Sequence, residues 1–560
     1  MTPQQKRWTL VAVVLGSSVV FLDTSVVNLA LPRIGQDLPS SNLGTLEAQS
    51  YVANAYFVTL SALLILAGAL TDHYGRKRVF SIGLVAFAAT SFLCGIAPSM
   101  EFLIGSRVLQ GAAGALLVPG SLAIITASFQ GEEQGRAFGV WAGASAATSI
   151  LGPFVGGVLV NTLSWRMAFF INLPLLAIAY LATRRYVQES RDEESSSHFD
   201  VLGSFVIVVA VGGLSFGTIR GQQHGWGEPI AIASLTIGAI AAIAFPFMML
   251  HRANPLVPPK LFRSRNFTIT NISTFVIYGA LYVLSTLLGI FMIGTLGYNE
   301  QAAGIAGVPG SLFLVLFSTR FGRLAARYGP RFFMSIGPAI MALGLLWYSR
   351  IPATSTAWVL GRGSILPPAS YFVDLLPGIL LFGFGLSIMV APLTTALMTS
   401  VPAKNSGVAS AINNAISRVG SPLLNAVIFV VVASSFYGAI ASRVPSAPVH
   451  SQQFRNDVAP LNKPTGDVSP EVVAAVKDAS TDAFHLAMLV AAGMLFAGAA
   501  VNGFGIRNPS AAGRHMGPAG EQPPPGAGSG APTGPVKVAP DDFTHGTGAP
   551  HEGTGPARDP

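Results

Sequence analysis

The sequence predicts an all-α protein that crosses a membrane many times. Only 10% of its 560 residues are charged and 51% are hydrophobic, whereas about a quarter of the residues of a soluble globular protein are charged. This excludes a soluble enzyme of several domains, and the apolar fraction excludes a chain that is disordered throughout. Apolar runs near the ~20 residues that a helix needs to cross the hydrocarbon core recur from end to end. None alternates with a period of two, so we expect helices rather than membrane-barrel strands.

Fourteen such runs predict fourteen transmembrane helices. The first run is too long for a signal peptide, and no small-residue cleavage site closes it, so we expect an uncleaved anchor. The predicted spans are 8–31, 48–70, 79–97, 102–126, 137–160, 166–182, 201–219, 229–250, 268–295, 303–320, 332–350, 371–397, 406–433 and 483–506.

The Lys and Arg residues predict the orientation. If both termini are cytoplasmic, the short cytoplasmic segments hold 20 Lys and Arg residues and the short outer loops hold five. Cytoplasmic loops of membrane proteins carry such an excess. The net charge of +8 therefore needs no nucleic-acid partner. We expect a multi-pass protein of the cell membrane, that is, the plasma or inner membrane.

The sequence carries no signature of an enzyme. The single cysteine, Cys94, excludes an intrachain disulfide and a multi-cysteine metal site. A phosphate-binding loop of the Gly-x₄-Gly-Lys-Ser/Thr type is absent, and Ser, His and Asp show no nucleophile arrangement at a readable spacing. We expect no catalytic residue, no metal and no cofactor.

An internal repeat predicts two halves. Residues 68–78 and 322–331 share Gly, Leu, Tyr, Gly and a basic residue at a constant offset. We predict an N-terminal six-helix half over 1–190, inserted transmembrane helices 7 and 8 over 191–255, and a C-terminal six-helix half over 256–508. We also expect an outer loop over 434–482 with a short helix near 470–478. The last segment, 509–560, contains 22 Gly or Pro among 52 residues and predicts a disordered cytoplasmic tail.

Four motifs occur in the predicted helices and loops, at residues 22–32, 68–78, 107–115 and 152–157. Trp165-Arg166 and Asn172-x-Pro174 follow them. In these helices and at this spacing, the motifs resemble those of the major facilitator superfamily, specifically its fourteen-helix drug:proton antiporter branch. The resemblance covers about residues 8–433. It implies the major facilitator fold, with two pseudo-symmetric six-helix halves and an inserted helix pair.

The motif at 68–78 is a predicted cytoplasmic gate, formed by Gly68, Asp72, Gly75, Arg76, Lys77 and Arg78. Its glycines permit a tight turn, and Asp72 can lie at the N-terminus of a helix of the other half, where the helix dipole favours a carboxylate. The basic residues can pair with Glu132 or Glu133. Since the second copy has Ala326 in place of Asp72, we expect a one-sided latch. The alternative is that the basic cluster only sets the topology.

The motif at 152–157 lies inside the fifth predicted span and contains Gly152, Pro153, Gly156 and Gly157. Pro153 removes a backbone hydrogen bond and is expected to bend the helix. The glycines let another helix approach closely, and ordinary small-residue packing is the alternative explanation. The resemblance implies that this helix seals one end of the cavity and that the protein is an antiporter.

Three ionisable side chains, Asp23, Arg107 and Arg418, lie deep in predicted spans. At 1.5 Å per helical residue they lie at ~22, ~21 and ~18 Å from the cytoplasmic face, so we expect Asp23 between the two arginines. Because the proton affinity of a carboxylate depends on a neighbouring cation, we predict that this set couples transport to protons. A static ion pair, or an Arg107 that snorkels to the interface, is the alternative.

The candidate cavity residues are polar or aromatic side chains within the spans: Asn28, Asn54, Tyr56, Gln110, Asn413 and Asn414. Ordinary helix packing is the alternative for each. We predict a proton-coupled antiporter that exports drugs or other amphiphilic molecules by alternating access, with the proton gradient as its energy source. Alternatives are a dedicated exporter of an endogenous lipid, siderophore or antibiotic, and a non-transporting receptor. The expected partners are the lipid bilayer, a small-molecule substrate and protons.

Overall fold

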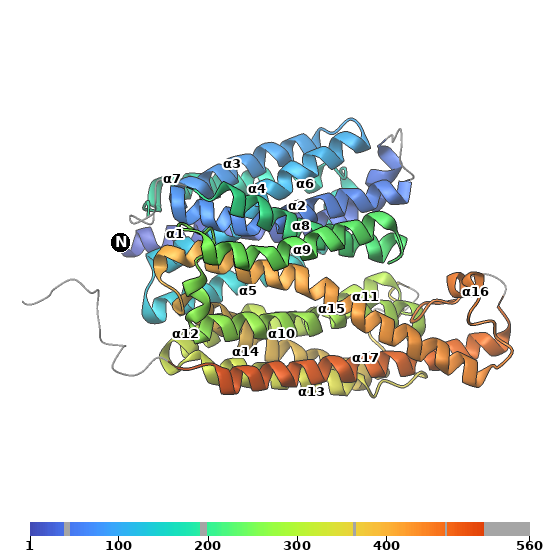
Figure 1. Cartoon of the computed structure of the whole chain (residues 1–560). Coiled ribbons are helices and arrows are strands. Elements are labelled where there is room, and N and C mark those ends of the chain that lie inside the picture. Colours follow the sequence, from blue (N-terminus) through green and yellow to red (C-terminus); the bar gives the residue numbers. More distant parts are fainter. Residues whose placement is uncertain (39–44, 191–198, 362–365, 465–467, 509–560) are drawn as a thin grey trace, which may run out of the picture. The chain divides into compact units, whose positions relative to one another are not determined.

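The computed structural model describes residues 1–38, 45–190, 199–361, 366–464 and 468–508, apart from a few side chains within helices. Throughout these ranges the regular structure is helical (Figure 1). Contacts divide the chain into a compact unit, Met1–Asn508, and a second unit, Pro509–Pro560. The predicted disordered tail therefore lies outside the described residues.

The first part of the chain forms helices with clear start signals. Thr2 forms a capping box with Gln5 at the start of the first helix, and Ser99 accepts a hydrogen bond at the start of the fourth. Gly75, with φ of 104°, makes the turn between the second and third helices. The helices are α1 (Pro3–Asp37), α2 (Thr45–Tyr74), α3 (Arg76–Gly95), α4 (Met100–Ser128), α5 (Gly131–Thr162), α6 (Met167–Phe170) and α7 (Asn172–Tyr186).

The predicted inserted pair corresponds to α8 (Val201–His224) and α9 (Pro229–His251). Asp200 caps α8 by accepting from the Gly203 amide, and Glu228 caps α9 by accepting from the Ala231 amide. The two helices pack against each other, and α8 also packs against α2 and α15. Helix α8 is thus part of the helix bundle, and α9 is joined to the bundle mainly through α8.

The remaining helices repeat the turn seen in the first part, since Gly329, with φ of 90°, separates two of them. Two π-helical segments and two short 3₁₀ segments interrupt the series. The elements are η1 (Pro259–Arg263), α10 (Arg265–Ile290), η2 (Phe291–Leu296), α11 (Glu300–Ala306), α12 (Val308–Tyr328), α13 (Pro330–Tyr348), η3 (Tyr371–Leu375), α14 (Leu376–Thr399), η4 (Ala403–Asn405), α15 (Ser406–Arg443), α16 (Gln452–Asp457) and α17 (Pro470–Gly505).

Each predicted span overlaps a helix of the structure. Among the described residues, 12 helices are long and apolar enough to cross a membrane, and α15 contributes a shorter apolar segment, Val427–Arg443. The all-helical, many-span architecture is therefore confirmed. The total of fourteen transmembrane helices stays a prediction.

Buried apolar residues gather in two large clusters, one mainly on α1–α9 and one mainly on α10–α17. Between them, α2 packs against α15 and α5 packs against α12. Glycines permit both contacts, because an added Cβ at Gly68 would collide with Gly407 and one at Gly322 would collide with Gly135. We call the end of the bundle that contains the turns at Gly75 and Gly329 the basic end.

The prediction of a loop over 434–482 is wrong at both of its ends. Helix α15 continues to Arg443, and α17 already begins at Pro470, so the predicted short helix near 470–478 is the first part of α17. Both extensions have buried apolar faces, including Phe436, Ile440 and Val476. A 2.5 Å ion pair between Arg443 and Asp482 joins them. Polar residues on one face lower the mean hydropathy of both extensions, so the apolar runs that predicted the spans stop short of these helix ends. The extensions are nevertheless amphipathic helices.

Candidate coupling centre, gate and substrate cavity

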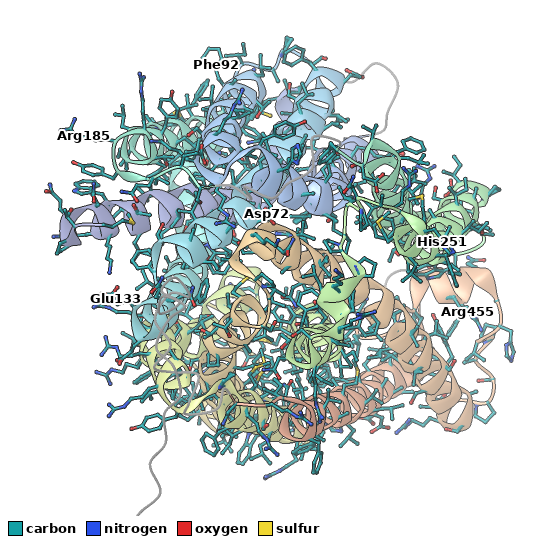
Figure 2. All side chains as sticks on the ribbon, turned by 60° about the vertical axis from the view of Figure 1, so that its left-hand side comes forward. Asp72, Phe92, Glu133, Arg185, His251 and Arg455 are labelled. Carbon is teal, nitrogen blue, oxygen red and sulfur yellow. The ribbon has the colours of Figure 1, made fainter. Side chains whose placement is uncertain are left out.

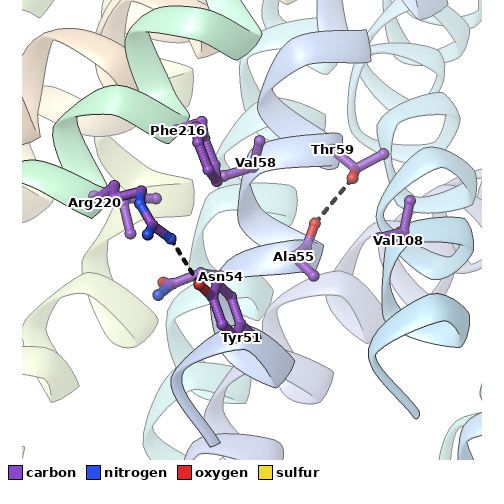
Figure 3. Close-up of a pocket in the computed structure, with 9 residues that line it drawn as sticks. Tyr51, Asn54, Ala55, Val58, Thr59, Val108, Phe216 and Arg220 are labelled. Carbon is purple, nitrogen blue, oxygen red and sulfur yellow. Dashed lines mark hydrogen bonds between the residues drawn. The ribbon is translucent and has the colours of Figure 1, made fainter. Parts of the chain in front are cut away.

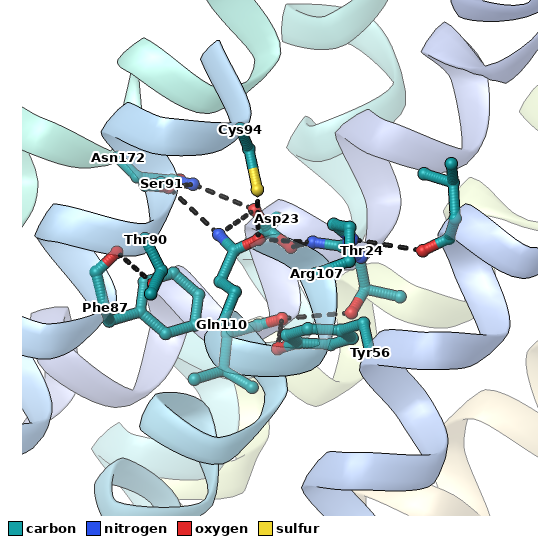
Figure 4. Close-up of polar contacts among 12 residues, drawn as sticks. Asp23, Thr24, Tyr56, Phe87, Thr90, Ser91, Cys94, Arg107, Gln110 and Asn172 are labelled. Atoms are coloured by element: carbon teal, nitrogen blue, oxygen red, sulfur yellow. Dashed lines mark hydrogen bonds and ion pairs between the residues drawn. The ribbon is translucent and has the colours of Figure 1, made fainter. Parts of the chain in front are cut away.

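A buried ion pair lies among the helices of the first half. The Nη1 atom of Arg107, on α4, donates to Oδ2 of Asp23, on α1, at 2.5 Å (Figure 4). The two side chains are 1% and 0% exposed. Arg107 also donates to the Gln110 side chain at 2.7 Å and to the Val52 carbonyl at 3.2 Å. Its guanidinium lies 4.2 Å from the centroid of the Tyr56 ring, a cation–π distance.

The second oxygen of Asp23 is held by two amides. Gln110 donates to Oδ1 at 2.9 Å, and Asn172, on α7, donates to the same atom at 3.0 Å. Both amides also donate to the Ser91 hydroxyl of α3, at 3.0 and 2.9 Å. Cys94 completes the network through a 3.4 Å contact from Sγ to Oε1 of Gln110. Both oxygens of the buried carboxylate therefore have hydrogen-bond donors, which a buried polar group requires.

Sequence reasoning did not assign Asn172 to this network. The available signal was its place before Pro174, inside a predicted span and after Trp165-Arg166. An amide at the start of α7 can reach α1 and α3 at once, because α7 packs against both helices. Asn172 thus adds a positioning side chain to the predicted coupling set.

The predicted position of Asp23 between two arginines is wrong. Within the described residues, Asp23 pairs with Arg107, while Arg418 of α15 has no hydrogen bond or ion pair and lines the central cavity instead. Similar depth does not bring two side chains together, because the rotation of each helix decides which neighbour its side chains face. Asp23 faces α3, α4 and α7.

The predicted gate residue Asp72 lies at the N-terminus of α15, as expected. Its carboxylate accepts from the backbone amides of Gly407 at 3.0 Å and Val408 at 2.9 Å. Positive partial charge at a helix N-terminus stabilises such a carboxylate. Arg76 pairs with Asp72 at 3.5 Å and donates to the Ala403 carbonyl. Figure 2 shows Asp72 in the interior of the bundle, where these contacts join α2 to α15.

The predicted pairing of Arg76, Lys77 and Arg78 with Glu132 or Glu133 is wrong. The backbone amides of Lys77 and Arg78 both donate to the Glu189 carboxylate, at 3.0 Å, which caps the start of α3. Glu132 instead pairs with Arg323 at 3.5 Å, and Glu133 pairs with Lys6. The α2–α3 turn and the start of α5 therefore use separate partners.

Two glycines of the 152–157 motif lie against α1. An added Cβ would meet Ser25 at Gly152 and Val26 at Gly156, so both positions permit close packing of α1 on α5. Helix α5 runs through Pro153 and Gly157, but the side-chain surroundings of these two positions lie outside the described residues.

A central cavity of about 680 Å³ lies between the helices of both halves. Of the predicted cavity residues, Asn54 and Asn414 line it. Lining side chains that sequence reasoning did not assign include Trp141 and Ser145 of α5, and Ser215 and Thr218 of the inserted helix α8. The three-residue spacing of Ser215 and Thr218 in an apolar span was the available signal, since it puts two hydroxyls on one helical face.

Three predicted cavity residues have other positions. Gln110 and Tyr56 belong to the buried Asp23 network, and Asn413 is buried and donates to Asn271 at 3.1 Å and Thr274 at 2.8 Å. Assignment of these three to the cavity wall is therefore wrong, because each turns toward a neighbouring helix of its own half. The side chain of Asn28 lies outside the described residues.

A smaller cavity of about 220 Å³ lies between α2, α4 and α8 (Figure 3). It shares Asn54 and Ile219 with the central cavity. At its rim, Arg220 donates to the Tyr51 hydroxyl at 2.6 Å and to Glu228 at 2.8 and 2.9 Å. These bonds fasten the inserted pair to α2.

Comparison with known proteins identifies the family. The model of the Major Facilitator Superfamily matches residues 13–425. The chain belongs to this superfamily. It is 32% identical to the multidrug resistance protein Stp of Mycobacterium tuberculosis over 76% of each chain. It is 30% identical to the tetracenomycin C resistance and export protein of Streptomyces glaucescens, also over 76% of each. Such relatives agree with the drug:proton antiporter branch.

A solved structure supports the same fold. The human organic anion transporter MFSD10 (TETRAN) superposes with a TM-score of 0.53 at 15% identity, over 88% of this chain and 100% of that one. At this identity the likeness concerns the fold alone. The family match and the apolar helices make the protein a multi-pass membrane transporter of this superfamily rather than an enzyme.

Proposed function

We propose that the protein is a proton-coupled antiporter that exports drugs or other amphiphilic molecules by alternating access. The observation that carries the proposal is the Asp23–Arg107 pair, which is buried among the helices of the first half. Ionisable groups at membrane depth mark ion and proton pathways. The resistance and export functions in the names of the relatives support drugs as substrates.

The contacts at the basic end support an outward-facing state. Asp72, Arg76 and the close glycine contacts hold α2 against α15 and α12 against α5 at that end. If the termini are cytoplasmic, as the distribution of Lys and Arg favours, this conformation is closed to the cytoplasm. The proposed location is the cell membrane.

Proton exchange at Asp23 is the proposed coupling step. Protonation neutralises the carboxylate and removes the charge that holds Arg107, so the network through Gln110 and Asn172 has to rearrange. Arg418 remains the second cation of the proposed coupling set, and it would approach Asp23 only in another conformation. Coupling arises because substrate and proton favour different conformations of one bundle.

The experiment compares Asp23→Asn with wild type in proteoliposomes. Proton-driven uptake should fall at least about tenfold, since the amide cannot exchange a proton, whereas substrate exchange without a gradient should persist. Asp482→Asn is the matched control, because it also removes a carboxylate, but from an exposed pair. Full gradient-driven transport by Asp23→Asn would contradict the proposal, and loss of exchange together with uptake would assign Asp23 a structural role.

A dedicated exporter of an endogenous lipid, siderophore or antibiotic is the second candidate. The compound-specific name of the tetracenomycin C relative favours it. Energised efflux of several unrelated dyes would support the multidrug function, whereas efflux of none would support a dedicated substrate.

A further inference from the structure

The central cavity contains a cation without a described counter-ion. Of the described lining residues, Arg418 alone is charged, and within that part of the chain no hydrogen bond or ion pair holds its guanidinium. A charge taken out of water is stable only when it is paired or hydrated. The cavity wall therefore presents an electropositive point to whatever enters it.

The helices that line the cavity offer no free carboxylate that could neutralise Arg418. Helices α8, α10, α12, α14 and α15, which line the cavity, contain no Asp or Glu. In α1, α2 and α5 every acidic residue except Asp23 lies near a helix end. Asp23 pairs with Arg107, and Asp72, in the last turn of α2, is bound at the N-terminus of α15. A cationic substrate would find no opposite charge here.

Further hydrogen-bond donors face the same cavity. Ser215, on the inserted helix α8, is only 8% exposed, and its buried hydroxyl has no hydrogen-bond partner among the described atoms. The neighbouring Thr218 and Ser417 hydroxyls instead bond to backbone carbonyls of their own helices, at 2.7 and 2.9 Å. A buried polar atom without a partner normally has a ligand or water beside it. Ser215 therefore provides a second, independent indication of a polar group in the cavity.

Most of the remaining wall is apolar or aromatic, with Asn54, Ser61, Ser145 and Asn414 as further polar side chains. Phe21, Phe57 and Trp141 come from the first half, and Leu281 and Leu314 from the second. A volume of about 680 Å³ is large enough for a drug-sized molecule. The wall thus suits a molecule with a bulky apolar body and one acceptor-rich head.

We propose that the central cavity selects acidic amphiphiles, with Arg418 binding the anionic head and Ser215 of the inserted helix donating a further hydrogen bond to it. This inference rests on the proposed export function but concerns the substrate class. It makes the inserted helix α8 part of the binding site.

The test measures equilibrium binding to the full-length protein in nanodiscs, with no proton gradient. The probes are pyrenebutanoic acid, its methyl ester and pyrenebutylamine, which share one apolar body and differ in head charge at about pH 7. We expect the acid to bind roughly tenfold or more tightly than the ester, and the amine most weakly, because a charge-assisted hydrogen bond is stronger than a neutral one.

Variants test which side chains cause the preference for the acid. Arg418→Gln should bind the acid and ester equally, Arg418→Lys should keep part of the preference, and Ser215→Ala should lose a smaller part. Arg320→Gln is the matched control, since Arg320 lies over the Phe317 ring and is not among the described lining residues. Thermal unfolding checks that every variant is folded.

Two results would overturn the proposal: equal binding of acid and ester by wild type, or an unchanged preference in a folded Arg418→Gln. Head-group selectivity needs no proton flux, so it can fail while Asp23-dependent transport succeeds. The reverse outcome, selective binding without proton-driven transport, would reject the proposed coupling alone.

Discussion

The turns after α2 and after α12 carry two copies of one motif, but they join the halves differently. At the first copy, Asp72 accepts two backbone hydrogen bonds from the start of α15. At the second copy, Ala326 stands in that place and lies against Gly135 of α5. Both copies bring a glycine, Gly68 or Gly322, against the backbone of the other half. We call the contacts of Asp72 with Arg76 and with the start of α15 the polar lock. Close approach of the helices and the polar lock are therefore separate features, and of the two copies only the first has the polar lock.

The shared glycine contact can be broken in both copies. Gly68→Val and Gly322→Val each place branched carbon against backbone, and such overpacking costs about 1–3 kcal/mol or more. We expect each variant to lose most transport, to a similar extent, because the basic end cannot close. Transport in proteoliposomes and spin-label distances across the basic end measure the effect.

Gly105→Val is the control for these variants, since an added Cβ at Gly105 meets nothing within 4 Å. If Gly322→Val were active while Gly68→Val was not, the two contacts would not be equivalent.

The polar lock should produce the next largest effect. Asp72→Asn removes the charged acceptor at the start of α15 and leaves Arg76 without its ion pair. Charged hydrogen bonds contribute about 1.5–3 kcal/mol, so open conformations of the basic end should become roughly tenfold more populated or more. The α2–α15 spin-label distance distribution measures this shift.

Ala326→Asp is the complementary variant, since it introduces a carboxylate at the position of the second copy that corresponds to Asp72. It should not create a second lock, because α5 begins with Glu132 and Glu133, whose charges repel a new carboxylate. A stabilised closed state in Ala326→Asp would contradict this explanation of the asymmetry.

The smallest effect is expected at the exposed ion pair of the second copy. Arg323 and Glu132 are 46% and 54% exposed and 3.5 Å apart, and such surface pairs contribute about 0–1 kcal/mol. Glu132→Gln should change transport less than about threefold, with the difference shrinking as salt is added. Transport rates at two ionic strengths test this, and a tenfold loss would make the pair a second lock.

The sequence predicted features that depend on hydropathy and local electrostatics. Spans were found because lipid requires long apolar helices, and Asp72 was assigned to a helix N-terminus because the dipole favours it there. Helix ends were harder to predict, since Arg443 and Pro470 mark amphipathic extensions beyond the apolar runs.

Side-chain partners were largely beyond prediction from one sequence. The membrane helices are apolar around much of their circumference, so nothing in the pattern indicated that Asp23 faces Arg107 and Arg418 faces the cavity. The same uncertainty in helix rotation placed Gln110 and Asn413 on the cavity wall, although both are buried between helices. The depth of a residue in the membrane can be estimated by counting residues along its helix. The direction in which its side chain points requires the packed structure.

The contact between Cys94 and Gln110 gives the protein an intrinsic optical reporter. Cys94 is the sole cysteine of the chain, and its thiol lies 3.4 Å from the amide oxygen that also accepts from Arg107. The S–H stretching vibration falls in an infrared window free of other protein bands, and its frequency follows the strength of the hydrogen bond that the thiol donates. When the carboxylate beside this amide gains or loses its proton, the thiol signal should shift in the unlabelled wild-type protein.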